Sequence, residues 1–323
     1  MRIHYASHAL VPSCEANSLQ VMKMCAALAR AGHALTLTCR RGPEAGAPHA
    51  FYGLAPDFRL RTVSGGNVRI VRRGLYSWRA AAHAAEPAEL LYGRDFHTLA
   101  LVALRGIGRA PIVLEVHQPP TSALERRLLA SLLVAPRLAL LVCISQALAE
   151  EYRARHPELR APIVVAPDGA DAPREPLPPP RPRGSPLELG YVGSLLPGKG
   201  LELIERLAPR LSAATFHVLG GSAADVERWR ARLAFPNVRL HGHVPHAEGQ
   251  ARMREFDLLL APYRPAVLIG GGGADVGRWM SPLKIFEYMA SGRAMVASDL
   301  PVLREVLIDG VNARLVPSDD VEG

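Results

Sequence analysis

The repeated alternation of short apolar runs with longer amphipathic stretches restricts the fold of this chain more than any other feature of its sequence. Strands that alternate with helices form parallel sheets with helices on their faces. One segment interrupts the alternation: "PREPLPPPRPRG", residues 173–184, carries too many prolines for a helix or a central strand. We therefore predict two α/β domains, residues 1–172 and 185–323, joined by a proline-rich linker at 173–184.

The apolar runs predict five strands in each half. In the first half they are 2–7, 34–39, 112–116, 139–144 and 163–166, and in the second 187–193, 215–220, 238–242, 257–262 and 294–298. Residues 18–31 predict a helix with Val21, Cys25 and Leu28 on one face and Gly32 as its C-terminal stop. Ligands of open α/β sheets bind at the carboxyl ends of strands, so we expect a functional site in the loops that follow these strands.

Charge is distributed unevenly along the chain. Residues 1–172 hold 20 of the 38 Lys and Arg but only 13 of the 30 Asp and Glu. A basic first half suits a phosphorylated substrate or an anionic lipid, and equally a surface kept soluble by arginine. The basic residues form no run and do not alternate with aromatic residues, so we expect no nucleic acid partner. The four cysteines form no C-x-x-C, which indicates a reducing compartment, and we expect a cytoplasmic protein.

The stretch "GSLLPGKG", residues 193–200, has the G-x-x-x-x-G-K spacing that opens a P-loop. A P-loop continues with a Ser or Thr hydroxyl that holds Mg²⁺, but this chain has Gly200 there, and Pro197 removes a backbone N–H donor. The pattern therefore argues against a triphosphatase. It favours a phosphate site in which Lys199 acts as a point charge without a metal. The alternative is a plain strand-to-helix turn with a solvated lysine.

A second stretch, residues 280–307, also points to phosphate. Ser281 predicts the N-cap of a helix, Pro282 its first turn and Gly292 its C-terminal stop. Apolar side chains fall on one side of this helix: Leu283, Ile285, Phe286, Met289 and Ala290. On the opposite, polar face we place Lys284, Glu287 and Tyr288. A cation in the first turn opposes the helix dipole unless a phosphate docks on the helix end. We expect a phosphate at Lys284 and ribose hydroxyls at Glu287; the alternative is a Lys–Glu pair on a solvated face.

Two other kinds of site find little support. The stretch "HGHVPH" places His241, His243 and His246 close together, but no fourth ligand is near in sequence, so we expect no metal. No G-x-G-x-x-G opens either half, which argues against a dinucleotide-dependent dehydrogenase.

Several motifs resemble those of one enzyme family. They are "YVGSLLPGKGLELI", "SPLKIFEYMASGRAMVASDLPVLREVL" and "VVAPDGAD", supported in the first half by "HYASHALVPSCEANSLQVMKMCAALARAGHALTL", "LLYGRD", "IVLEVHQ" and "LVCISQALAEEY". Together and in this order they resemble the retaining nucleotide-sugar glycosyltransferases of glycosyltransferase family 4 (group 1). The resemblance covers nearly the whole chain. It implies the GT-B fold, in which two Rossmann-like domains face each other across a cleft.

The resemblance also implies which residues hold the donor diphosphate. Lys199 in the "PGKG" turn would contact it, together with Gly193, Ser194 and Gly198 of the same turn. The β-phosphate would meet helix-end amides and charge from Ser281, Pro282, Leu283 and Lys284.

Other positions carry over to the nucleoside and the sugars. Glu287 matches the second glutamate of the family's E-x7-E motif, which binds the ribose hydroxyls, and the turn of Gly242 and His243 would border the nucleobase. His117 in "EVHQ" would lie by the transferred sugar, although a histidine at a strand end is also common in a core. The loop from Pro12 to Asn17 would face the acceptor and the donor sugar.

The chain departs from the family pattern in places. Trp279 stands where the first glutamate of E-x7-E is expected, and Ser194 stands where the family often has arginine. Asp275 or the amides of the loop "GGGGADVGRW" are our candidates to replace the missing carboxylate. The family continues with further helices after "NARLVPSDDVEG", so we expect this chain to be partial.

The resemblance predicts a transferase that needs no metal and no cofactor, since Lys199, Lys284 and helix amides would stabilise the leaving diphosphate. Its partners would be a nucleotide-sugar donor and a glycan, lipid-linked or small-molecule acceptor. Residues 123–141 combine arginines with apolar residues and suit contact with the inner face of a membrane, or more simply a core helix followed by a strand. Two alternatives remain open: a GT-B sugar-nucleotide epimerase and a non-catalytic sugar-nucleotide-binding protein.

Overall fold

The computed structural model divides into two compact units, Met1–Ala166 and Pro167–Gly323. It describes residues 1–64, 72–84, 86–173, 176–179, 181–182, 184–268 and 275–322. The loop residues 269–274 and part of the proline-rich linker, both discussed in the sequence analysis, lie outside the described residues. No helix in the described ranges is long and apolar enough to cross a bilayer.

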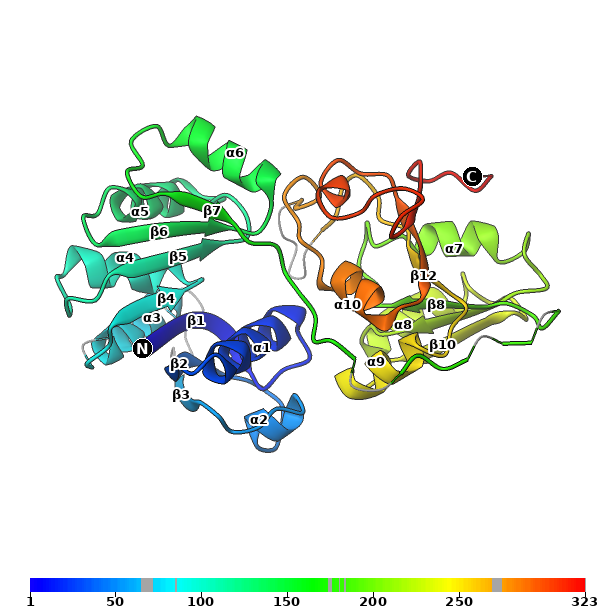
Figure 1. Ribbon diagram of the computed structural model, residues 1–323, viewed down its shortest axis with the longest axis horizontal. Coiled ribbons are helices and arrows are strands. Elements are labelled where there is room, and N and C mark those ends of the chain that lie inside the picture. The colour runs from blue at the N-terminus through cyan, green and yellow to red at the C-terminus, as the bar shows by residue number, and fades with distance from the viewer. Residues whose placement is uncertain are drawn as a thin grey trace. The chain divides into compact units, whose positions relative to one another are not determined.

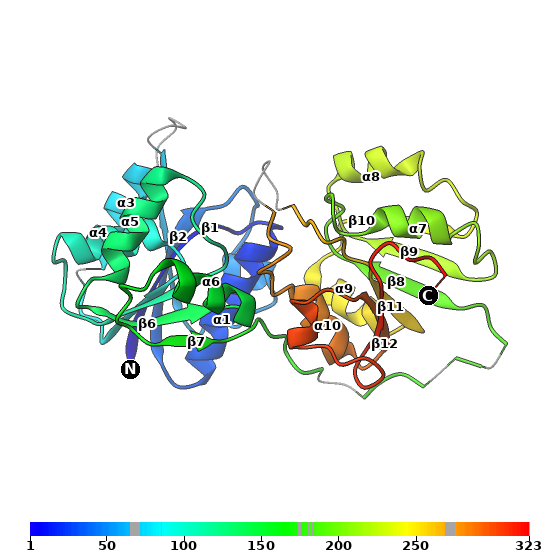
Figure 2. The same ribbon diagram turned by 90° about the horizontal axis from the view of Figure 1, so that it is seen from above.

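Within the described residues, the first unit is built on a seven-stranded parallel sheet with the order β3-β2-β1-β4-β5-β6-β7. The strands are β1 Arg2–Val11, β2 Ala34–Arg41, β3 Arg59–Val63, β4 Leu90–Gly93, β5 Ile112–Val116, β6 Leu138–Cys143 and β7 Ile163–Val165. The helices are α1 Ala16–Arg30, α2 Pro48–Phe51, α3 Arg72–His83, α4 Phe96–Leu104, α5 Ala123–Leu133 and α6 Gln146–Arg155. α1 covers one face of the sheet, and α3, α4 and α5 lie side by side on the other (Figure 2).

The packing of α1 follows from its sequence. Val21 and Cys25 are fully buried against β1 and β2, Leu28 packs at the margin of the same core, and Gly32 ends the segment with φ +87°. A positive φ is open to glycine and strained for other residues, so the predicted stop is confirmed. The predicted loop from Pro12 to Asn17 is shorter than expected, because α1 already begins at Ala16.

The second unit repeats the plan with a sheet that, in its described part, has six parallel strands in the order β10-β9-β8-β11-β12-β13 (Figure 1). The strands are β8 Glu188–Val192, β9 Thr215–Leu219, β10 Val238–Gly242, β11 Leu258–Ala261, β12 Ala294–Ser298 and β13 Arg314–Val316. The helices are α7 Leu201–Leu207, α8 Ala223–Arg230, α9 His246–Met253 and α10 Leu283–Ser291, followed by the 3₁₀ turn Leu303–Glu305. α7 and α8 enclose one core with the sheet, and α9 and α10 enclose the other.

All ten predicted strands are present within a few residues of their expected ends, and the predicted α/β class with two parallel sheets is confirmed. β3, β4 and β13 were not predicted. They are three to five residues long, too short to show a clear apolar pattern. Residues 123–141 form α5 and the start of β6, which agrees with the simpler of the two interpretations of that stretch.

The proline-rich segment lies against the second unit. The boundary between the two compact units falls at Ala166–Pro167, so residues 173–184 belong to the second unit instead of separating two bodies. The guanidinium of Arg254 donates to the carbonyl of Pro176.

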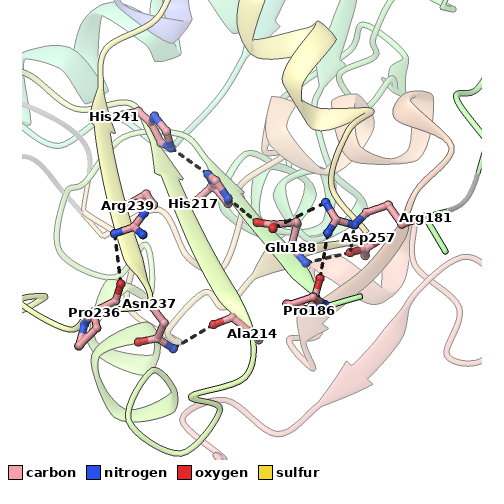
Figure 3. A network of polar contacts seen from close by, with 10 residues as sticks. All are labelled: Arg181, Pro186, Glu188, Ala214, His217, Pro236, Asn237, Arg239, His241 and Asp257. Carbon is pink, nitrogen blue, oxygen red and sulfur yellow. Dashed lines mark hydrogen bonds and ion pairs between the residues drawn. The ribbon is translucent and has the colours of Figure 1, made fainter. Parts of the chain in front are cut away.

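Arg181 continues this attachment through a polar network on the sheet. Its guanidinium forms ion pairs with Glu188 at 3.6 Å and Asp257 at 3.5 Å (Figure 3). Glu188 in turn accepts a hydrogen bond from His217 Nε2 at 2.6 Å, and His217 Nδ1 lies 2.9 Å from Nε2 of His241. The segment around Arg181 is therefore fixed to the start of β8 by charge as well as by backbone contacts.

Candidate active site

At the carboxyl edge of the second sheet, three strands end in closely packed glycines. The N–H of Gly193 donates to the carbonyl of Leu219 at 2.9 Å, and the N–H of Gly220 donates to the carbonyl of Gly242 at 2.6 Å. A Cβ on Gly220 would lie 2.0 Å from the carbonyl oxygen of Gly193. Only glycine fits this approach, and it leaves the ends of β8, β9 and β10 without side chains at these points.

The turn after β8 is held in place by two further glycines. Gly198 and Gly200 have φ values of +81° and +96°. A Cβ on Gly198 would lie 2.1 Å from the carbonyl oxygen of Ala266, and one on Gly200 would lie 1.8 Å from that of Pro262. The "PGKG" pattern is therefore required by backbone contact with the segment after β11, and that contact fixes the position of Lys199.

Lys199 and Lys284 share a group of tyrosines. Lys284 Nζ lies 4.0 Å from the ring centre of Tyr191 and 4.5 Å from that of Tyr263, and Lys199 Nζ lies 5.2 Å from the ring centre of Tyr263. We call these four residues the lysine–tyrosine cage. Cation–π contacts hold an ammonium group but leave its three N–H donors unused. Among the described residues, Lys284 Nζ is buried and has no hydrogen-bond partner.

The surroundings of the cage lower the pKa values of both lysines. Burial lowers the pKa of Lys199 to about 8. Burial, and after it the charge of Lys199, hold the pKa of Lys284 well below its usual value. The chain has only three lysines, Lys23, Lys199 and Lys284, among its 38 basic residues. Two of the three thus approach the same tyrosine ring, Lys284 buried and Lys199 partly buried.

The position of Lys284 corrects the prediction of a polar, solvated helix face. Lys284 is 7% exposed and Tyr288 is fully buried. The Tyr288 hydroxyl accepts a hydrogen bond from the N–H of Val192 at 2.7 Å, so its polar end is satisfied inside the core. The alternative placed a Lys284–Glu287 pair on a solvated face, but both side chains are largely buried, and the charge of Glu287 opposes the effect of burial on the pKa of Lys284.

Glu287, the next polar residue of α10, has a different partner. Its Oε1 lies 2.8 Å from Nε2 of His246, the first residue of α9, and both side chains are about four-fifths buried. Since a carboxylate only accepts, His246 Nε2 donates. The site therefore contains a carboxylate oriented by a histidine, a contact that the sequence analysis missed.

The start of α10 differs from the prediction. The helix begins at Leu283, Pro282 occupies the cap position, and no side chain caps the helix end. The predicted N-cap, Ser281, accepts a hydrogen bond from the N–H of Asp168 at 2.8 Å and so ties the beginning of the second unit to this helix. The first-turn N–H groups of Leu283 and Lys284 remain available as helix-end donors. The C-terminal stop is as predicted, with Gly292 at φ +71°.

Of the candidates proposed to replace the missing glutamate, Asp275 has a structural role. Asp275 Oδ1 accepts hydrogen bonds from the N–H of Val267 at 2.7 Å and of Gly277 at 2.9 Å, which closes the base of the loop. Arg278 lies over the ring of Trp279 at 5.4 Å. The loop residues 269–274, which precede Asp275 in the sequence, lie outside the described ranges.

The three histidines of "HGHVPH" have separate surroundings. His241 contacts His217, His246 contacts Glu287, and His243 is exposed after the turn at Gly242, whose φ is +70°. The part of the chain that the structure describes contains no group of three His, Cys, Asp or Glu side chains suited to a metal ion. Ser194 is exposed, and its carbonyl accepts a hydrogen bond from the Tyr191 hydroxyl at 2.7 Å.

In the first unit, His117 belongs to a buried network at the carboxyl end of β5. Its Nε2 lies 2.5 Å from Glu115 Oε1, the Tyr92 hydroxyl donates to Glu115 Oε2 at 2.5 Å, and Arg94 Nε lies 3.6 Å from Oε1. Burial lowers the pKa of His117 to about 4. Burial by itself raises the pKa of Glu115, but the hydrogen bond from His117 and the charge of Arg94 outweigh it and lower that pKa to about 2. His117 is therefore a neutral imidazole that donates through Nε2.

The sequence analysis missed the partners of His117. The one signal was Glu115, a charged residue inside the otherwise apolar run "IVLEV". A buried carboxylate needs a partner, and Arg94 and Tyr92 supply it from the end of β4.

Comparisons with known proteins agree with this architecture. Residues 19–174 match the family model "Glycosyltransferase Family 4", and residues 186–323 match "Glycosyl transferases group 1". A phosphatidyl-myo-inositol mannosyltransferase of Mycolicibacterium smegmatis is 34% identical over 131 residues, 39% of this chain and 31% of the relative. A glycogen synthase of Mycobacterium tuberculosis is 30% identical over 172 residues, 50% of this chain and 38% of the relative. The chain thus spans only about a third of the length of the curated relatives it matches.

Solved structures share the fold along the whole chain. Sucrose-phosphate synthase of Thermosynechococcus elongatus has a TM-score of 0.72 at 17% identity, over 99% of this chain and 87% of that one. Anabaena HepE, solved in complex with UDP and glucose, has a TM-score of 0.70 at 16% identity, over 100% of this chain and 87% of that one. With matches to both halves of one enzyme family and a GT-B fold of two parallel-sheet units, the chain belongs to the family 4 (group 1) glycosyltransferases.

Proposed function

We propose that the protein transfers a sugar from a nucleoside-diphosphate sugar to an acceptor hydroxyl, with retention of configuration and without a metal ion. The observation that carries this proposal is the unpartnered, buried ammonium group of Lys284 beside Lys199. Two lysines that approach the same tyrosine ring suit a diphosphate, whose negative charge would favour the ammonium form of both.

The same charges would assist the reaction. When the bond between the sugar's anomeric carbon and the β-phosphate oxygen breaks, negative charge develops on the phosphate. Lys199, Lys284 and the first-turn amides of α10 would stabilise that charge, because they are fixed in a buried place before the reaction starts. Donors that bind the leaving group most strongly after the bond breaks lower the barrier.

We infer retention of the anomeric configuration from the resemblance to the retaining enzymes of the family. The acceptor oxygen would bond to the anomeric carbon on the face that the phosphate leaves, and the acceptor proton would pass to the departing phosphate oxygen. His117, a neutral imidazole held by Glu115, would orient the transferred sugar by hydrogen bonding instead of attacking it. Glu287 would accept the ribose hydroxyls, and the turn at Gly242 and His243 would border the base.

The acceptor is proposed to be a glycan or a lipid-linked molecule. The relatives named phosphatidyl-myo-inositol mannosyltransferase and glycogen synthase support one of these classes each. A lipid-linked acceptor would bring the protein to the cytoplasmic face of a membrane, which co-sedimentation with anionic vesicles would test.

Thermal-shift and calorimetric titrations with UDP, GDP and ADP, each with magnesium and with EDTA, test the donor site. We expect one nucleoside diphosphate to stabilise the protein equally with magnesium and with EDTA. Lys199→Ala should weaken binding of this nucleotide, whereas Lys23→Ala should leave its affinity unchanged. A requirement for magnesium would contradict the metal-free site.

Turnover is tested separately. Incubation with the matching nucleotide sugars, followed by NMR of the product's anomeric configuration, is expected to show the configuration of the donor. Binding without consumption of any donor would identify the non-catalytic alternative.

A further inference from the structure

His246 is absent from every role implied by the family resemblance, yet it forms a hydrogen bond with Glu287. It is the first residue of α9, and Glu287 lies in the second turn of α10. The two helices pack side by side in both ribbon views (Figures 1 and 2). The 2.8 Å hydrogen bond between His246 Nε2 and Glu287 Oε1 therefore joins two helices at the carboxyl edge of the sheet.

The geometry restricts how Glu287 presents its carboxylate. A glutamate side chain has several rotatable bonds, and at the end of a partly buried helix it would otherwise sample several rotamers. A donor at Oε1 fixes the orientation of the carboxylate plane. A carboxylate has about four acceptor positions on its two oxygens, and the bond from His246 occupies one of them.

The chemical type of the partner also matters. Lysine or arginine at this point would neutralise Glu287 and compete with a weakly polar hydroxyl for its lone pairs. Lys284, one turn earlier on the same helix, directs its amino group against the rings of Tyr191 and Tyr263. A histidine that donates one hydrogen bond orients the carboxylate and leaves its acceptor strength for a ligand.

We propose that His246 is a positioning residue that aims Glu287 at the ribose diol of the donor and thereby selects ribonucleotides over deoxyribonucleotides. The inference rests on the proposed function, in which Glu287 binds that diol. It assigns His246 a role in recognition in addition to joining α9 to α10.

The test compares two ligands on matched variants. The nucleoside diphosphate that binds the wild type and its 2′,3′-dideoxy counterpart are titrated calorimetrically into wild type, His246→Ala, His246→Gln and the control His156→Ala, a histidine at the end of α6 in the first unit that is hydrogen-bonded to Glu158. His246→Ala should weaken binding of the ribonucleotide about 5- to 10-fold, the range for one lost hydrogen bond. It should leave the affinity for the dideoxynucleotide unchanged. His246→Gln, which keeps an N–H donor, should recover part of the loss, and His156→Ala should match the wild type.

A merely structural histidine would give another pattern. If His246→Ala reduced the affinity for both nucleotides equally, or for neither, the proposal would be overturned. Glu287→Gln provides a second route if His246→Ala folds poorly: it should reduce the preference for the ribonucleotide, and an unchanged preference would equally overturn the proposal. Failure of the wild type to bind any nucleoside diphosphate would refute the proposed function itself, and that result appears before any variant is made.

Discussion

The ammonium group of Lys284 lies 4.0 Å from the ring centre of Tyr191, buried, with no hydrogen-bond partner among the described residues. A buried charge is normally paired, because removing it from water is costly. Here the faces of Tyr191 and Tyr263 compensate only part of that cost. The folded protein therefore retains an unsatisfied amino group whose pKa burial holds well below its usual value, and the properties of the protein should change when that group is removed.

Replacing Lys284 with methionine should separate binding from stability. Methionine fills a similar volume without a charge, so the free energy of unfolding at pH 7 should rise by about 1–2 kcal/mol. The affinity for the nucleoside diphosphate should fall about 10- to 100-fold, because charge-assisted hydrogen bonds are lost. Urea unfolding and calorimetric titration measure the two quantities, with Lys23→Met as control. Retained affinity with reduced stability would show that Lys284 is only a structural residue.

Nucleotide binding should take up protons at pH 8. Burial lowers the pKa of Lys199 to about 8, and a bound diphosphate favours the charged ammonium form and raises that pKa again. Above about pH 8 the free protein must therefore bind a proton along with the ligand, and the affinity should fall as the pH rises. Calorimetry in two buffers of different ionisation enthalpy reports the uptake. In Lys199→Ala the uptake should decrease, and equal uptake in both proteins would assign it to other groups.

Substituting alanine for Gly200 should be far more damaging than the same change at Gly32. Both glycines have positive φ values, +96° and +87°, so both substitutions carry backbone strain. A Cβ at Gly200 would in addition lie 1.8 Å from the carbonyl oxygen of Pro262, whereas nothing lies within 4 Å of one at Gly32. We expect Gly32→Ala to lower the free energy of unfolding by about 1 kcal/mol and Gly200→Ala by about 3 kcal/mol or more. Similar losses in urea unfolding would mean that the turn after β8 adapts without strain.

Mild acid should destabilise the first unit. His4 is 3% exposed, hydrogen-bonded to Thr38 at 2.9 Å, and burial lowers its pKa to about 4. The unfolded chain, with a histidine pKa near 6.5, binds more protons between pH 6.5 and 4, so stability is lost as the pH falls through this range. Burial also lowers the pKa values of His8 and His117 to about 4, so both add to the dependence of the unfolding free energy on pH.

His4→Gln isolates one share of this effect. It keeps a group that can hydrogen-bond to Thr38 but does not titrate. The slope of unfolding free energy against pH should decrease by up to about 1.4 kcal/mol per pH unit between pH 6.5 and 4. An unchanged slope in urea titrations at pH 7, 6 and 5 would show that His4 does not contribute.

The sequence was sufficient for the fold because strand and helix patterns are local. Runs such as 112–116 and 294–298 are apolar along their whole length, and their observed ends match the prediction. The orientation of α10 was less predictable. Sorting by polarity placed Lys284 and Tyr288 on the side opposite the apolar residues, but amphipathic side chains bury readily when their polar ends find a carbonyl, an amide or an aromatic face.

Contacts between residues distant in sequence were beyond prediction. Glu287 and His246 lie 41 positions apart, and nothing in "HGHVPH" indicates that its last histidine faces a glutamate of another helix. The roles of Lys199, Glu287 and His117 in binding or transfer stay predictions. The structure adds that Lys199 and Lys284, 85 positions apart in the printed numbering, approach the same tyrosine ring.

The scarcity of lysine has a practical consequence for following this site. An amine-directed reagent meets only three lysines and the terminal amino group on the entire chain. A lysine with a lowered pKa carries more free amine near neutral pH and is the better nucleophile. Labelling followed by peptide mass spectrometry would thus read occupancy of the cage through protection of the Lys199 peptide, with the Lys23 peptide as an internal standard.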